Sequence, residues 1–268
     1  MEPALSIRTT VVDAYRFVLH HQGRLARMAL PWLLAAFAVA TLPPRAGLGP
    51  AEAWTGAGGL VDLLGVSAVA AAFVRRLRRG DPWPRLAAPP DGAALRYLAG
   101  GLLVGVLVGL AAVALGSVFT VIAGLLGTLA PPVAGILLIP VVPVLVAALL
   151  GVYGRLAPLP VVAVLGGGFS PAAVWRRTRR HGLRILLIQL GVLVPLLVAA
   201  VVAAALFAGL AGGDEPVLPS EGGPLTPVGI LADLALRSVG YAEAALTGTA
   251  LAAVELRLPP APVRPAPG

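Results

Sequence analysis

Four ionisable residues lie inside otherwise apolar sequence, and these are the side chains that could do chemistry there. Asp62 lies in one apolar run, and Asp233, Arg237 and Glu243 lie in another. Charged groups at membrane depth are costly and are therefore functional candidates by default. Asp233 and Arg237 are four residues apart, so they would share one face of a helix. Such a group can form a neutralised tie between helices or a relay for protons or ions, and we favour the tie.

The depth of these residues predicts which of them meet. Asp62 lies about 12 Å and Arg237 about 15 Å from the outer ends of their predicted helices, at about 1.5 Å per residue. We therefore predict a cluster of Asp62, Arg237 and Asp233 that joins the second and sixth spans. If the sixth span began deeper, Asp233 would lie at the outer surface and Arg237 would only extend toward it.

No other catalytic chemistry is indicated. The chain has no cysteine, which excludes disulfides, thiolate catalysis and cysteine-ligated metals. It has no phosphate-binding loop with lysine, no paired histidines for zinc and no Gly-x-Ser-x-Gly motif. The three histidines, His20, His21 and His181, lie in basic flanks. We predict no catalytic residue, no metal, no cofactor and no enzymatic activity.

The composition indicates the class of protein that must position these charges. The 268 residues are 58% hydrophobic and only 12% charged, whereas ordinary soluble domains have about 25% charged residues. The run Tyr97–Gly154 has 58 residues without a charge. A helix crosses a bilayer with about 20 apolar residues. We therefore predict an all-α, polytopic integral membrane bundle.

Six spans fit the apolar runs. The expected ranges are 28–42, 54–73, 97–125, 132–153, 185–210 and 227–254. The long run holds two of them, with a turn near Gly127–Pro132 where glycine, threonine and proline interrupt the helix. Thr226 and Pro227 provide a cap and a first turn for the last span. Residues 1–257 then form one membrane domain, and 258–268 form a disordered proline-rich tail.

The arginines predict the orientation. All 20 basic residues are arginine, and 18 of them flank the apolar runs on one side, in the N-terminal segment, two loops and the C-terminal tail. Basic residues concentrate on the cytoplasmic side of membrane proteins. We therefore expect both termini in the cytoplasm of a bacterial cell, with the chain in its inner membrane. Nucleic-acid binding is disfavoured, because the arginines do not form one basic face with aromatic residues.

The segment Leu156–Trp175 competes as a seventh span. Its 20 residues carry no charge, but three prolines and a run of three glycines make a continuous helix unfavourable. Crossing here would also place Arg176–Arg180 on the outer side. We expect a re-entrant or surface element, and the sequence does not decide between the two.

Two amphipathic elbow helices are expected at the inner interface. In residues 5–21, Ile7, Val11, Tyr15 and Val18 recur at helical spacing. A basic elbow precedes the fifth span, and its residues are Trp175, Arg176, Arg177, Arg179 and Arg180. We expect both to face anionic headgroups on the cytoplasmic side, so that membrane lipids are the predicted partners.

Small residues and prolines predict two packing features. Gly101, Gly105 and Gly109 form a stripe that would let another helix approach, and we favour packing within the fold over a homodimer face. Pro140 and Pro143 predict a kink in the fourth span, in preference to an ion site at a broken helix. The oligomeric state is left open.

The order of motifs in the second half resembles a known family. Gly135-Ile-Leu-Leu-Ile-Pro140 is followed by Tyr153-Gly-Arg-Leu-Ala-Pro158, then by Phe169-Ser-Pro-Ala-Ala-Val-Trp175, the arginine cluster and the next span, and Glu255-Leu-Arg257 closes the chain. This pattern is similar to that of poorly characterised bacterial membrane proteins related to the membrane domain fused to some glycerophosphodiester phosphodiesterases. The resemblance implies six helices in an inner membrane. It implies no phosphodiesterase activity and assigns no functional residue.

Two functions are compatible with these sequence features. We expect a non-catalytic, membrane-embedded structural or lipid-interacting module. The alternative is a small transporter or channel that uses Asp62, Asp233 and Arg237. A water-accessible cavity lined by these charges would favour transport, whereas packed charges and exposed basic elbows would favour the module.

Overall fold

The computed structural model describes residues 6–88, 90–129, 139–166, 168–210 and 226–258. Within these ranges the chain is helical and has no strand, which confirms the predicted all-α class. The helices are α1 (Ile7–His20), α2 (Gln22–Arg45), α3 (Ala51–Arg79), α4 (Gly92–Leu129), α6 (Val141–Leu156), α7 (Leu159–Val164), α8 (Pro171–Thr178), α9 (Gly182–Leu210) and α10 (Pro227–Arg257). The predicted disordered tail lies outside the described residues from 259 onward.

Five of the described helical segments are long and apolar enough to cross a membrane. They are Gln22–Arg45, Ala51–Arg79, Gly92–Thr128, Val141–Val164 and Gly182–Leu210. The sixth predicted span, 227–254, is a continuous part of the 31-residue α10. It is not among the five, because its charged residues and small side chains make it less apolar. The multi-pass membrane character is thus confirmed on five segments.

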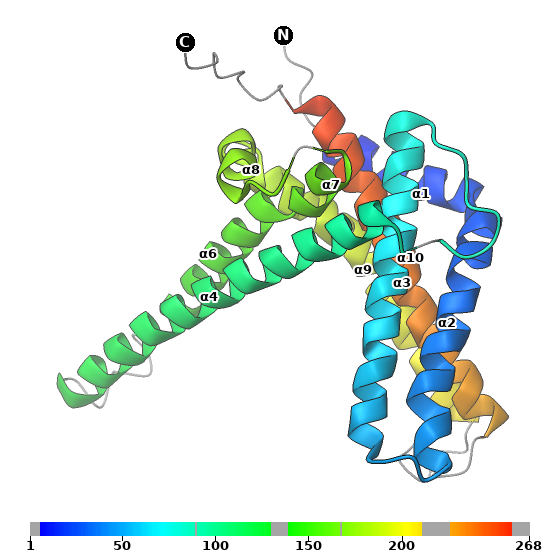
Figure 1. Cartoon of the computed structure of the whole chain (residues 1–268). Coiled ribbons are helices and arrows are strands. Elements are labelled where there is room, and N and C mark those ends of the chain that lie inside the picture. Colours follow the sequence, from blue (N-terminus) through cyan, green and yellow to red (C-terminus); the bar gives the residue numbers. More distant parts are fainter. Residues whose placement is uncertain (1–5, 89, 130–138, 167, 211–225, 259–268) are drawn as a thin grey trace.

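The helices form two arms that join at one end of the molecule. The chain ends of α1 and α10, the last turn of α3 and all of α8 lie at this end, which we call the arginine-rich end (Figure 1). From there α2, α3, α9 and α10 run together as one arm, and the α4–α6 hairpin diverges as the other. Only 6% of the most apolar stretch of α4 is buried against the rest of the chain. Its side chains are therefore available to lipid.

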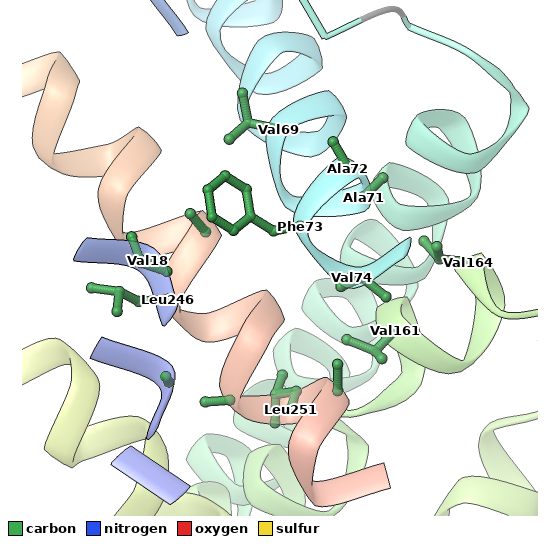
Figure 2. Close-up of a cluster of buried hydrophobic side chains, with 14 of the residues drawn as sticks. Val18, Val69, Ala71, Ala72, Phe73, Val74, Val161, Val164, Leu246 and Leu251 are labelled. Carbon is green, nitrogen blue, oxygen red and sulfur yellow. The ribbon is translucent and has the colours of Figure 1, made fainter. Parts of the chain in front are cut away.

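The core lies where α1, α3 and α10 meet. Phe73 is fully buried, and Val18, Val69 and Leu246 lie close to it (Figure 2). The Phe73 ring also makes an edge contact with Trp83 of the loop before α4, with centroids 4.9 Å apart. Burial of an apolar side chain of this size contributes about 1.5–3 kcal/mol. This core fixes α10 against α3 and so sets the register of their charged residues.

The segment Leu156–Trp175 is not a seventh span. It folds as the end of α6, the short α7 and the start of α8. Gly166 and Gly168 have φ values of +89° and +72°, a conformation that ends the helix and favours glycine. The rejection of a span is therefore confirmed. Leu159 and Val161 of α7 are fully buried, so the first part of this segment lies inside the protein and not on its surface.

Within the described residues, the prolines of the fourth span kink no helix. Pro140 is the residue before α6, and Pro143 lies in its first turn. Backbone N–H groups in the first turn have no partner within the helix, so a proline there breaks no hydrogen bond. The predicted start of this span, 132–138, lies outside the described residues. The two prolines thus favour the start of a helix and do not bend one.

The N-terminal amphipathic helix is confirmed as α1. Its predicted apolar face is used for packing: Val18 is buried, and Ile7, Val11 and Tyr15 lie against the core. The Tyr15 hydroxyl donates a hydrogen bond to the carbonyl oxygen of Val192 in α9 at 2.9 Å. The opposite face carries exposed arginines. Thus α1 is anchored to the bundle on one side and open on the other.

Candidate functional site

The predicted charge cluster forms between α3 and α10. The Arg237 Nε donates to Asp233 Oδ2 at 2.7 Å, and its Nη1 is paired with Asp62 Oδ2. The Tyr241 hydroxyl donates to the other oxygen of Asp62 at 3.1 Å. The predicted contact between Asp62 and Arg237 is therefore confirmed. Since Asp233 bonds Arg237 within one helix, the group joins α10 to α3 through the Arg237 guanidinium and the Tyr241 hydroxyl, both of which bond Asp62.

A helix cap on α10 and a glycine on α3 position the side chains of the charge cluster. The Thr226 hydroxyl accepts from the N–H of Gly229 at 3.0 Å and so starts α10 at Pro227. On α3, Gly65 leaves room for Tyr241: a Cβ added to Gly65 would lie 2.5 Å from the Tyr241 hydroxyl oxygen. Glycine at this position therefore permits the hydrogen bond between Tyr241 and Asp62.

The cluster is partly buried and satisfies its own charges. The Arg237 and Asp62 side chains are each 21% exposed, and Asp233 is 17% exposed. One guanidinium compensates two carboxylates, and the Tyr241 hydroxyl stabilises the excess negative charge. Removal of charges from water is repaid only when such partners are in place. Both carboxylates, Asp62 and Asp233, are bonded to Arg237, so neither is free to act as a base. The arrangement is therefore that of a structural link between two helices.

Glu243 does not belong to the cluster. Six residues after Arg237, it lies roughly 120° further round the helix at about 3.6 residues per turn. It lines a different cavity of ≈ 230 Å³ together with Tyr97, Tyr153 and Gln189. Of the four intramembrane charges that the sequence offers as candidates, Glu243 therefore lies apart from the other three.

The basic elbow is confirmed as a helix but is only partly open. Ser170 caps α8 by accepting from the N–H of Ala173 at 3.3 Å. Arg177 is paired with Glu255 of α10 at 2.9 Å. The Arg155 guanidinium lies over the ring of Trp175, 4.7 Å from its centroid. Of the five predicted elbow residues, three are therefore exposed, namely Arg176, Arg179 and Arg180.

Most of the exposed arginines gather at one end of the molecule. Ten of them have neither an acidic partner nor a side-chain hydrogen bond among the described residues, and they are Arg8, Arg16, Arg24, Arg27, Arg85, Arg96, Arg176, Arg179, Arg180 and Arg184. All ten flank the apolar segments on the side that the sequence predicts to be basic. The fold thus presents a dense positive surface there.

Other arginines at this end hold the loops in place. Arg75 binds Asp91 at 2.6 Å, and Asp91 also caps α4 by accepting from the N–H groups of Ala93 and Ala94. Burial acts to raise the pKa of Asp91, but these donors and the Arg75 guanidinium together lower it below the usual value. Asp91 therefore stays ionised and keeps the loop before α4 attached to α3.

The glycine stripe of α4 does not pack within the fold. A Cβ added at Gly101, Gly105 or Gly109 would meet nothing within 4 Å. The prediction of fold-internal packing is therefore wrong. Close helix contacts occur at other glycines: a Cβ added to Gly100 would lie 2.7 Å from the Cα of Pro160, and one added to Gly154 would lie 2.6 Å from the carbonyl oxygen of Gly182.

Sequence reasoning missed two residues that complete these sites. Tyr241 follows Arg237 by four residues, a spacing that could have placed it beside the cluster. Gln189 is the one side-chain amide in the fifth predicted span, 185–210. A polar side chain in so apolar a run could have been noted as a candidate.

Comparison of the chain with models of protein families, with curated proteins and with solved structures finds no match.

Proposed function

We propose that this protein is a non-catalytic module of a bacterial inner membrane that binds anionic lipid headgroups at its arginine-rich end. The supporting observation is the set of ten exposed arginines around the joined ends of the helices. Each arginine near an anionic membrane surface contributes about 1 kcal/mol of attraction. The proposed orientation places this end, with both chain termini, in the cytoplasm, in line with the positive-inside rule.

The transport alternative has less support. Asp62, Asp233 and Arg237 are paired with one another, and none of them lines the cavity that contains Glu243. A relay needs a carboxylate that can exchange its proton or ion, and a carboxylate held by a guanidinium exchanges it poorly. The resemblance to the membrane domain of some phosphodiesterases is compatible with a module of this kind and remains part of the proposal.

The experiment compares lipid preference in nanodiscs that contain zwitterionic and anionic lipids. Native mass spectrometry or lipid spin-label exchange would measure the preference of the protein for the anionic lipid. We expect the wild type to favour anionic lipid, and the triple variant Arg176→Gln, Arg179→Gln, Arg180→Gln to lose a large part of this preference. A contribution of about 1 kcal/mol per arginine predicts roughly a fivefold loss for each one.

The control is Arg45→Gln, at the opposite end of α2. It removes one charge from the end of α2 that the proposed orientation places outside the cell. We expect it to leave the lipid preference unchanged. Equal preferences in the wild type and the triple variant would refute the proposed role of the elbow.

A further inference from the structure

A second site lies where the two arms meet. The cavity of ≈ 230 Å³ is bounded by α3, α4, α6, α7, α9 and α10. Its lining is mostly apolar, with five polar side chains: Tyr97, Tyr153, Gln189, Glu243 and Thr247. No arginine of the described residues lines it, so among them it shares no residue with the basic surface on which the proposed function rests.

Glu243 is an acidic group without a counter-charge. It lies about 24 Å from the start and about 21 Å from the end of α10, at about 1.5 Å per residue. The other acidic residues of this helix, Asp233 and Glu255, are paired with arginines. No arginine or histidine of the described residues pairs with Glu243. Glu243 is exposed in the structure, and a carboxylate at this membrane depth is costly unless a cation joins it or it takes up a proton.

The Gln189 amide lies within hydrogen-bond reach of the Tyr153 hydroxyl, and its Oε1 is left without a donor. Its side chain is only 8% exposed, and its Oε1 has no hydrogen-bond partner among the described residues. A buried polar atom left unsatisfied is uncommon and requires an explanation. Gln189 and Glu243 line the same cavity. The Oε1 of Gln189 and the carboxylate of Glu243 can both accept a hydrogen bond from one donor placed there.

Two tyrosines of the cavity also favour a positively charged ligand. Tyr97 and Tyr153 line the same cavity as Glu243. Aromatic rings attract ammonium groups through their π-systems. An anionic headgroup does not fit, since the cavity offers it a carboxylate and no cation. The lining therefore selects for a positively charged donor.

The cavity continues into open apolar space along α4. Gly101 lines it, and Gly105 and Gly109 extend the same smooth face, where added side chains would meet nothing within 4 Å. Beyond this point α4 diverges from α3 and α10 (Figure 1). A hydrocarbon chain attached to a group in the cavity can thus pass along the glycine face into the space between the arms.

We propose that this cavity binds the ammonium group of a lipophilic amine. Glu243 supplies the counter-charge, the Oε1 of Gln189 accepts a hydrogen bond from the ammonium, and the hydrocarbon chain lies along Gly101, Gly105 and Gly109. The inference goes beyond the proposed function, because it concerns a cation and not an anionic headgroup.

The test uses the full chain in phosphatidylcholine nanodiscs with tetradecylamine as the probe. Tetradecanol, which has the same chain and no charge, is the reference compound. We expect the amine, but not the alcohol, to raise the midpoint of thermal unfolding of the wild type. Glu243→Gln should weaken amine binding by at least about tenfold, because it removes the charge partner. Glu52→Gln, an exposed carboxylate at the start of α3, should bind like the wild type.

Two further measurements distinguish a loss of binding from a loss of folding. Glu243→Gln removes an unpaired charge and should fold at least as well as the wild type without ligand. Gly101→Leu points into open space, so it should fold normally but weaken binding of the long-chain amine. Loss of the amine effect when phosphatidylethanolamine is added would identify the membrane lipid as the source of the ammonium group. Equal stabilisation by amine and alcohol, or unchanged binding by Glu243→Gln, would overturn the proposal.

Discussion

Arg237 is the residue that connects the carboxylates of the charge cluster between α3 and α10. It bonds one carboxylate on its own helix and one on the neighbouring helix. Inside a low-dielectric environment, removal of one member of such a group leaves the others uncompensated, which costs about 3–5 kcal/mol for a fully buried pair. The partial exposure of these side chains lowers that cost.

Replacement of Arg237 by alanine should therefore destabilise the protein by about 2–3 kcal/mol, below the cost for full burial. The physical reason is that Asp62 and Asp233 lose their shared partner. The triple replacement Asp62→Asn, Asp233→Asn, Arg237→Gln should recover most of this loss, since no unpaired charge remains. Thermal unfolding of the purified protein in detergent measures both effects.

The matched control for this prediction is Arg27→Ala on α2. Arg27 is exposed and has no ion-pair partner among the described residues, so its loss should change stability little. An Arg237→Ala protein that melts with the wild type would show that the tie does not hold the helices. A triple variant less stable than Arg237→Ala would contradict the electrostatic explanation.

The residues of the cluster could be predicted because depth and helical spacing are local properties. Asp62 and Arg237 lie at similar distances from the ends of their helices, and Asp233 shares the face of Arg237. Glu243 could not be assigned in the same way. Its neighbours Tyr97 and Tyr153 come from α4 and α6, whose position depends on the angle between the arms, and no local pattern encodes that angle.

At the level of the helices, close contacts depend on glycines that show no regular spacing. Gly154 of α6 lies against the carbonyl oxygen of Gly182 at the start of α9. The regular stripe Gly101, Gly105 and Gly109 has no protein neighbour. A smooth face permits close approach but does not specify which helix fills it. The sequence therefore identified smooth faces and could not distinguish a packed face from an open one.

Gly154→Ala tests the packed contact. The added Cβ would lie 2.6 Å from a backbone oxygen, which cannot move without a shift of α9. Such overpacking costs about 1–3 kcal/mol. Gly151→Ala on the same helix has nothing within 4 Å and should be neutral or stabilising, because alanine favours helix by about 1 kcal/mol over glycine. Equal unfolding midpoints for the two variants would contradict the close approach of α6 and α9.

At the scale of the whole molecule, the alternation of apolar runs and arginines predicts the helices but not the angle between the two arms. The helices and their order follow from it, because length and hydropathy are sufficient to define them. The divergence of α4 and α6 does not follow, because lipid contacts an apolar helix as favourably in a splayed arm as in a compact bundle. That divergence creates the cavity around Glu243 and exposes the glycine stripe.

Distances between spin labels can test the divergence directly, and the absence of native cysteine makes the labelling selective. Val66 and Gly101 line the same cavity, so labels at Val66→Cys and Gly101→Cys should lie close together. Ala53 and Ala114 are each 13 residues further toward the opposite end, about 20 Å along their helices. In diverging arms the second pair should be much further apart than the first. In a compact bundle, where neighbouring axes stay about 8–10 Å apart, the two pairs would give similar distances, and that result would refute the splayed arrangement.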